Sequence, residues 1–109
     1  MTDNSSARAT TLDEYQRLAS RTINPALSTE QRLLDAAAGL AEEAGEVLGH
    51  VRKHALHGRQ LDRAELVEEL GDALWCLAIA AAALGAPLSE VAEGNLAKLR
   101  RRYPDGFAT

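Results

Sequence analysis

The sequence contains little of what several protein classes require. Cys76 is the one cysteine among 109 residues, which excludes a disulfide framework and a cysteine-rich zinc site. Aromatic residues make up 4%, and the apolar residues are mostly Ala and Leu, which favour close helix–helix packing over a β sandwich. The formal net charge of −4 argues against general nucleic-acid binding.

Long hydrophobic runs are also missing. The first residues, MTDNSSARATT, contain no apolar segment of a secretory signal. The run 73–91 is nearly uncharged but is broken by Gly-Ala-Pro, so it predicts a buried helix followed by a turn, not a membrane span. We therefore expect a cytoplasmic protein with a loose leader over residues 1–10 and a single helical domain over residues 11–109.

Helix start and stop signals divide this domain into four segments. Thr11, Ser28 and Asp62 each precede a Glu or Gln by three residues, which is capping-box spacing, and Gly58 suits a helix C-terminus. The four expected helices span residues 11–24, 28–56, 62–84 and 87–103. The sequence predicts an all-α fold, a four-helix bundle whose small core is completed by homo-oligomerisation.

Two acidic groups interrupt the apolar pattern of the second and third helices. At about 100° per residue, Glu43 lies at the edge of the apolar stripe, Glu46 beyond it, and Glu42 almost opposite. Glu69 and Asp72 lie at the edge of the stripe on the third helix. The residues expected to form the two core stripes are Leu33, Ala37, Leu40, Ala44, Val47, Leu48, Val51 and Ala55, and Leu66, Leu70, Ala73, Leu74, Leu77 and Ala81.

Antiparallel packing of these helices would bring the acidic pairs together. Two like charges 4 Å apart repel by on the order of 4 kcal/mol at an effective dielectric constant near 20, so the cluster needs a cation. An all-oxygen ligand set suits Mg²⁺ or Mn²⁺. Gly45 and Gly71 lie inside the two pairs, and we interpret them as sites of close packing or ligand approach. The alternative is that both acidic pairs are solvated helix faces.

The sequence EEAGE at residues 42–46, followed after 22 residues (47–68) by ELGD at residues 69–72, resembles a family signature. It is similar to the EExxE…ExxD motif of MazG-like, all-α nucleoside triphosphate pyrophosphohydrolases, and the similarity continues to Phe107. The resemblance implies a homodimer or homotetramer that uses Mg²⁺ to hydrolyse an NTP or dNTP to the monophosphate and pyrophosphate. The metal ligands that it implies are Glu43, Glu46, Glu69 and Asp72.

Glu42 matches the first glutamate of the signature, and Glu42 and Glu43 are the predicted catalytic carboxylates. Orienting the attacking water and binding a further ion are both open for Glu42, because it points away from the expected core. A rival enzyme is an all-α dUTPase or dCTPase with one preferred base, and a rival from another class is a non-catalytic helical interaction module. No motif here encodes base or sugar preference.

A triphosphate also requires cationic or polar groups from the protein. Asn95, Lys98 and Arg102 form one stripe on the fourth helix, and their segment resembles the substrate-contacting C-terminal helix of the family. Lys53 lies seven residues after Glu46, about 10 Å along the helix. We predict that these four residues, Lys53, Asn95, Lys98 and Arg102, bind substrate. The alternative for the basic residues is that they complement the helix dipole.

Two further patterns have competing interpretations. His50, His54 and His57 have a spacing that could build a zinc site, although a solvated basic helix end explains them more simply. Trp75 and Ile79 form a second apolar face on the third helix. We predict that this face is an oligomer interface more than a nucleobase pocket, although Trp75 could serve both.

Overall fold

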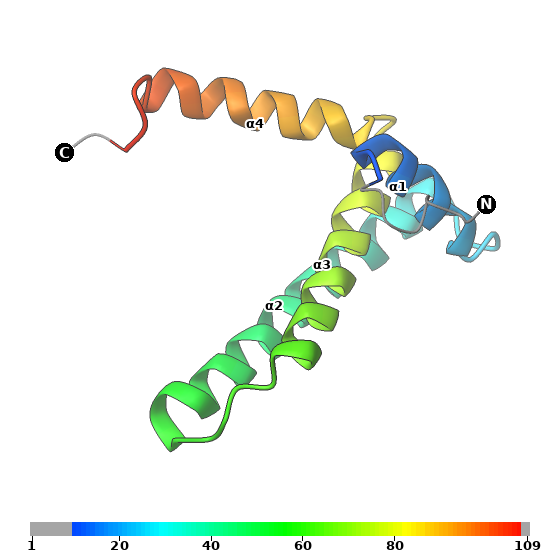
Figure 1. Ribbon diagram of the computed structural model, residues 1–109. Helices are drawn as coiled ribbons and strands as arrows, with labels where there is room; N and C mark the ends of the chain where they lie inside the picture. The colour runs from blue at the N-terminus through cyan, green and yellow to red at the C-terminus, as the bar shows by residue number, and fades with distance from the viewer. Residues whose placement is uncertain (1–9, 108–109) are drawn as a thin grey trace, which may run out of the picture.

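The computed structural model describes residues 10–107 and contains four α-helices (Figure 1). They are α1 (Leu12–Ala19), α2 (Thr29–His57), α3 (Arg63–Ala83) and α4 (Leu88–Arg102), with a short 3₁₀ helix, η2 (Ser20–Thr22), after α1. Residues 10–107 form no β-strand, only an isolated bridge between Pro104 and Gly106. The all-α prediction is confirmed. The predicted leader lies, apart from Thr10, outside the described residues.

Local capping determines where these helices begin and end. Ser28 Oγ accepts a hydrogen bond from Gln31 N at 3.1 Å, and Ser28 N donates to Gln31 Oε1 at 2.9 Å, which completes a capping box on α2. Thr11 and Asp62 each accept from the backbone N–H three residues ahead. Gly58 ends α2 in the left-handed conformation with φ of 69°. These boundaries lie close to the predicted ones because the signals are local in sequence.

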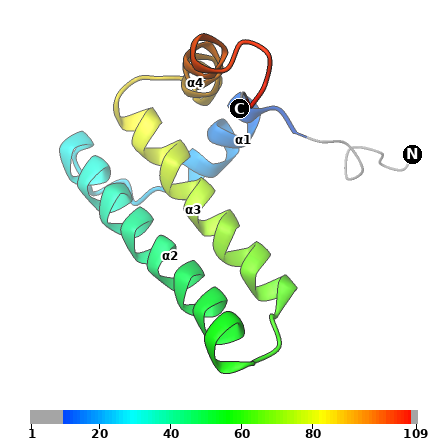
Figure 2. The same cartoon turned by 90° about the vertical axis from the view of Figure 1, so that its left-hand side faces the viewer.

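The helices form a hairpin with one projecting arm. α2 and α3 run side by side in opposite directions, and α1 packs against α3 near the end where α4 begins (Figures 1 and 2). α4 leaves α3 at a bend of 101°. Among the described helices, α4 contacts α1 and α3 but not α2.

Within residues 10–107, no single helix is both long and apolar enough to cross a membrane, although α3 and α4 taken together across their bend pass on length and composition alone.

The core is small and lies at the α1 end of the hairpin. Ala19, Ala36 and Ile79 form one buried cluster, against which Tyr15 and Trp75 pack. A second cluster joins Ala78, Ala81 and Leu88 where α1, α3 and α4 meet. Four of the seven buried hydrophobic residues are alanines, so the helices approach closely but bury little apolar area per residue.

Many residues of the predicted core stripes are exposed in the described chain, along the whole hairpin. Leu70 is 53% exposed and Leu48 is 65% exposed, and Val51, Leu74 and Leu77 are also exposed. α3 is apolar around most of its circumference, so its helical periodicity does not reveal which face α1 covers. We call these five exposed residues the leucine face.

Of the two predicted interface residues, Ile79 is buried and Trp75 is partly exposed. Ile79 is 2% exposed and is covered by its own chain, so it has no surface left for a partner, and its assignment to an oligomer interface is corrected. Trp75 is half-buried, and its Nε1 donates to Thr22 Oγ1 at 2.8 Å. Trp75 also packs against the buried cluster of Ala19, Ala36 and Ile79 but is not fully covered, so its place in an oligomer interface stays a prediction.

Gln16 of α1 connects the start of α4 to the rest of the molecule. Its side chain is 9% exposed, and Oε1 accepts from Leu88 N at 3.0 Å. Nε2 donates to Ala78 O at 3.0 Å and to Ala86 O at 3.1 Å. The first N–H groups of a helix lack intrahelical acceptors, and Pro87 at the N-cap has no side-chain acceptor. Gln16 therefore acts as the cap of α4, although 72 residues separate it from Leu88.

Asp13 provides a second connection between α1 and α4. Ser89 N donates to Asp13 Oδ1 at 2.8 Å, and Ser89 Oγ donates to Asp13 Oδ2 at 2.7 Å. These two hydrogen bonds hold the pKa of Asp13 below its usual value. Together, Asp13 and Gln16 fix the direction in which α4 projects.

Candidate metal centre

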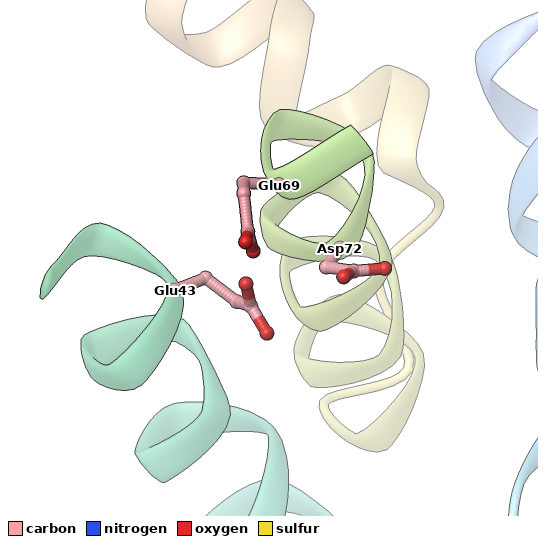
Figure 3. A group of neighbouring side chains, drawn as sticks. All are labelled: Glu43, Glu69 and Asp72. Carbon is pink, nitrogen blue, oxygen red and sulfur yellow. The ribbon is translucent and has the colours of Figure 1, made fainter. Parts of the chain in front are cut away.

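Three carboxylates converge between α2 and α3. Glu43 reaches across from α2 toward Glu69 and Asp72, which lie one turn apart on α3 (Figure 3). One oxygen from each residue lies within 4.8 Å of the others. We call Glu43, Glu69 and Asp72 the acidic triad. The triad forms because i, i+3 spacing puts Glu69 and Asp72 on one side of α3, opposite Glu43 on the antiparallel helix.

Glu43 carries the strongest sign that a cation belongs here. Its Oε1 is buried, and none of the described residues forms a hydrogen bond with it. Buried polar atoms normally have partners, and an unpaired buried carboxylate oxygen is unfavourable. Three oxygen donors, one of them otherwise unpartnered, fit a hard divalent cation such as Mg²⁺. The donor set includes no sulfur or nitrogen ligand that would favour zinc.

Glu46, the fourth predicted ligand, lies beside the triad on the exposed side of α2. A hydrogen bond with Glu69 raises the pKa of Glu46, and the negative charges of Glu69 and Asp72 raise it further. Three of the four predicted ligands therefore form one group, and Glu46 lies near Glu69 outside it, so its role as a ligand stays a prediction.

His50 is a neighbour of this centre that the sequence interpretation missed. Its Nδ1 lies 3.3 Å from Glu65 Oε1, and its Nε2 lies 3.6 Å from Glu69 Oε2. Its position four residues after Glu46 was the available signal. His54 Nδ1 instead meets Arg59 O at 2.7 Å, so the histidines of residues 10–107 do not form the alternative zinc site.

A pocket of about 370 Å³ adjoins the triad on its α1 side. Its walls include two triad members and Trp75, and Glu42 lines it as well. The complete lining is Asp35, Ala38, Gly39, Glu42, Glu43, Asp72, Trp75 and Cys76. Acidic groups therefore surround one end of the pocket, and an indole lines its wall.

α2 and α3 are in close contact at Gly39. A Cβ at this position would lie 2.9 Å from Cys76 Sγ. Burial raises the pKa of the Cys76 thiol, as do neighbouring carboxylates including Glu43. Gly45 and Gly71 differ, because no atom of the described residues lies within 4 Å of their Cβ positions. The prediction of close packing at these two glycines is therefore wrong within the described chain, and the alternative, ligand approach, stays a prediction.

The predicted substrate-binding residues are not assembled at the triad within one chain. Asn95, Lys98 and Arg102 are exposed on α4, which does not contact α2. Lys53 lies near the tip of the hairpin and lines a separate pocket with Glu65. The structure therefore brings the acidic residues together and leaves the basic residues apart from them.

Comparison with protein families gives one match. The model described as the MazG nucleotide pyrophosphohydrolase domain matches residues 31–107. The match covers α2, α3 and α4, and with them every carboxylate of the candidate centre. No curated protein and no solved structure matches the chain.

Proposed function

Since this chain belongs to the MazG nucleotide pyrophosphohydrolase domain family, we propose that it hydrolyses a nucleoside or deoxynucleoside triphosphate to the monophosphate and pyrophosphate with Mg²⁺, or Mn²⁺ in its place. The family supports nucleotide pyrophosphohydrolase activity in general. The observation that carries the finer proposal is the acidic triad with the buried, unpartnered Oε1 of Glu43.

The acidic triad would hold the metal, with Glu46 available at its rim. When bound, the metal neutralises phosphate charge and makes a bound water more acidic. Phosphoryl transfer requires little covalent chemistry from the protein, so positioning and charge neutralisation account for most of the catalysis. Glu43 would supply the ligand from α2, opposite the two ligands on α3.

Glu42 is the candidate proton acceptor. It lines the pocket beside Glu43 and Asp72 but is exposed and belongs to no triad contact, so its carboxylate is free to meet water. In the proposed reaction, a water oxygen bonds to phosphorus and the bond to the pyrophosphate leaving group breaks. The bonding electrons go to the leaving oxygen, and Glu42 takes a proton from the water.

The pocket next to the triad is the proposed site of the nucleoside. It is lined at one end by triad carboxylates and further along by Trp75, whose ring offers a surface for a base. This arrangement would place the phosphates at the triad and the base toward α1. Trp75→Leu should then raise KM more than it lowers kcat, because the ring contacts the base and not the reacting phosphate.

A screen of the common NTPs and dNTPs for pyrophosphate release, with and without Mg²⁺, tests this function. We expect metal-dependent release of pyrophosphate and monophosphate. Activity on dUTP or dCTP alone would identify the one-base enzyme, and orthophosphate with diphosphate would show a phosphatase. Absence of release from every nucleotide would contradict the proposal and favour a helical interaction module.

A further inference from the structure

We infer that Asp35 selects the base of the substrate, favouring bases with an exocyclic amino group (adenine, cytosine and guanine) over uracil and thymine. This inference rests on the proposed function, because it assigns a role to one wall of the pocket proposed for the nucleoside. It also gives that pocket a substrate class, which is nucleotides whose base donates a hydrogen bond from an amino group.

Asp35 lies at the end of the pocket that is further from the acidic triad. It is eight residues before Glu43 on α2, which is about 12 Å along the helix. Trp75 is three residues after Asp72 on the antiparallel α3, which is about 4.5 Å, so it lies between the triad and the level of Asp35. A base stacked on the Trp75 ring, with its phosphates at the triad, would therefore point its outer edge toward Asp35.

The Asp35 carboxylate is close to the pocket and has no assigned partner. Burial is the largest cause of the raised pKa of the Cys76 thiol, and the charges of Glu43 and Asp35 raise it further, so Asp35 lies near this wall of the pocket. Within residues 10–107, Asp35 is exposed and takes part in no ion pair. An ionised carboxylate in this position can accept hydrogen bonds from a ligand.

The side chains that line the pocket offer few hydrogen-bond donors. All four charged residues of the lining are Asp or Glu, which only accept when ionised. The Nε1–H of Trp75 is already bonded to Thr22 Oγ1 at 2.8 Å. Ala38 and Gly39 have no polar side chain, and the Cys76 thiol is a weak donor. The backbone N–H groups of the lining lie inside α2 and α3, where helix bonds use them.

A surface that accepts hydrogen bonds but hardly donates them distinguishes between base edges. Adenine N6, cytosine N4 and guanine N2 are amino groups, and each can donate to a carboxylate. Uracil and thymine have a carbonyl oxygen at the position of the cytosine amino group, so a lone pair would face the Asp35 carboxylate. That oxygen would also find no donor among the lining side chains, which makes its burial unfavourable.

Matched nucleotide pairs test the inference through kcat/KM for pyrophosphate release. The members of the pair dCTP and dUTP share their sugar and phosphates, and ATP differs from purine riboside triphosphate only by its 6-amino group. The wild-type protein should prefer the amino member of each pair by about 10-fold or more. Asp35→Asn supplies an amide that both donates and accepts, so it should bring both ratios close to one and raise the activity on dUTP.

Glu30→Gln is the matched control, because Glu30 is exposed on α2 and does not line this pocket; it should keep the wild-type ratios. Equal kcat/KM within the pair that is hydrolysed faster, or a preference for dUTP over dCTP, would overturn the inference. The proposed function would still stand in that case, because pyrophosphate is released. A contact between Asp35 and a sugar hydroxyl would give equal values within a pair, since both members have the same sugar.

Nucleotide binding without turnover tests the same contact. Trp75 is the only tryptophan in the chain, so its fluorescence reports the occupancy of the pocket. The monophosphates of the same two pairs, titrated with Mg²⁺ present, should quench this fluorescence with a Kd about 10-fold lower for the amino member. Asp35→Asn should remove that difference, and Glu30→Gln should keep it. Equal Kd values within both pairs, or no quenching by any of the four, would overturn the inference even if no nucleotide is hydrolysed.

Discussion

Polar side chains have hydrogen-bond partners at the α1–α4 junction, whereas carboxylates cluster with few partners in the acidic part of the α2–α3 hairpin. At the junction, Nε2 and Oε1 of Gln16 and both carboxylate oxygens of Asp13 form hydrogen bonds. At the hairpin, Glu43 Oε1 is buried without a partner among the described residues, and interaction with the Glu69 carboxylate raises the pKa of Glu46.

This difference separates what stabilises the fold from what serves a ligand. A satisfied buried network stabilises a single arrangement of helices, which the junction requires in order to direct α4. Clustered carboxylates repel one another unless a cation lies between them, so we attribute them to the proposed metal binding and not to folding. Substitutions at the junction should therefore change mainly stability, and substitutions at the carboxylates should change mainly activity.

The largest expected effect is on turnover at the acidic triad. Glu43→Gln, Glu69→Gln and Asp72→Asn should each lower kcat/KM on the order of 100-fold or more, because a neutral amide binds a divalent cation poorly. Glu68→Gln, an exposed neighbour on α3, is the matched control and should keep near-wild-type activity. Near-normal pyrophosphate release from any two triad variants would contradict the assignment of the acidic triad as the catalytic metal site.

Gln16→Ala should give the largest loss of stability. It removes three hydrogen bonds and leaves Leu88 N and two carbonyl oxygens without their partner. We expect unfolding free energy to fall by about 3 kcal/mol, measured by urea denaturation. Gln60→Ala, in the exposed linker between α2 and α3, should change it little. Equal effects of the two substitutions would show that the junction does not support the fold.

Gly39→Ala should cost less, about 1–3 kcal/mol, because the new Cβ would lie 2.9 Å from Cys76 Sγ. Cys76→Ala removes the sulfur that the new Cβ would meet. The double variant should therefore lose less stability than the two single variants lose when their losses are added. Thermal melting of the four proteins in this cycle measures the coupling. Strict additivity would mean that α2 and α3 are not in close contact here.

The smallest expected effect concerns Asp13 and pH. Its pKa is lowered in the folded chain, so its contribution to stability is present above the pKa of the unfolded chain and is lost as pH falls through the lower folded value. Asp13→Asn should lose that contribution at neutral pH and show a weaker decline in Tm upon acidification. If the Tm of Asp13→Asn falls as steeply with acidification as the wild-type Tm, the Asp13 carboxylate is not the cause of that fall.

Much of the fold could be read from local sequence signals. Ser28, Asp62 and Gly58 act on their immediate neighbours, and the structure places helix boundaries there. The i, i+3 spacing of Glu69 and Asp72 likewise follows from helix geometry alone, so their convergence with Glu43 was predictable once the hairpin was assumed.

The remaining features depend on contacts between distant segments. α3 is apolar on most sides, so its sequence could not show that α1 covers Ile79 and leaves Leu70 exposed. Gln16 reads as an ordinary polar helix residue, and its partners lie 62 to 72 positions away. Lys98 and Arg102 were recognised as a stripe, but the direction of α4 depends on the same junction.

Metal binding in the absence of nucleotide tests the acidic triad most directly. Adding Mg²⁺ or Mn²⁺ should raise the Tm of the wild-type protein, because an ion that binds only the folded state stabilises it. Asp72→Asn and Glu69→Gln should melt at or above the wild-type Tm without metal, since charge repulsion is reduced, and should show a much smaller increase with metal. An equal metal-induced increase in wild type and both variants, with Glu68→Gln alongside, would contradict the assignment of the triad as the metal centre.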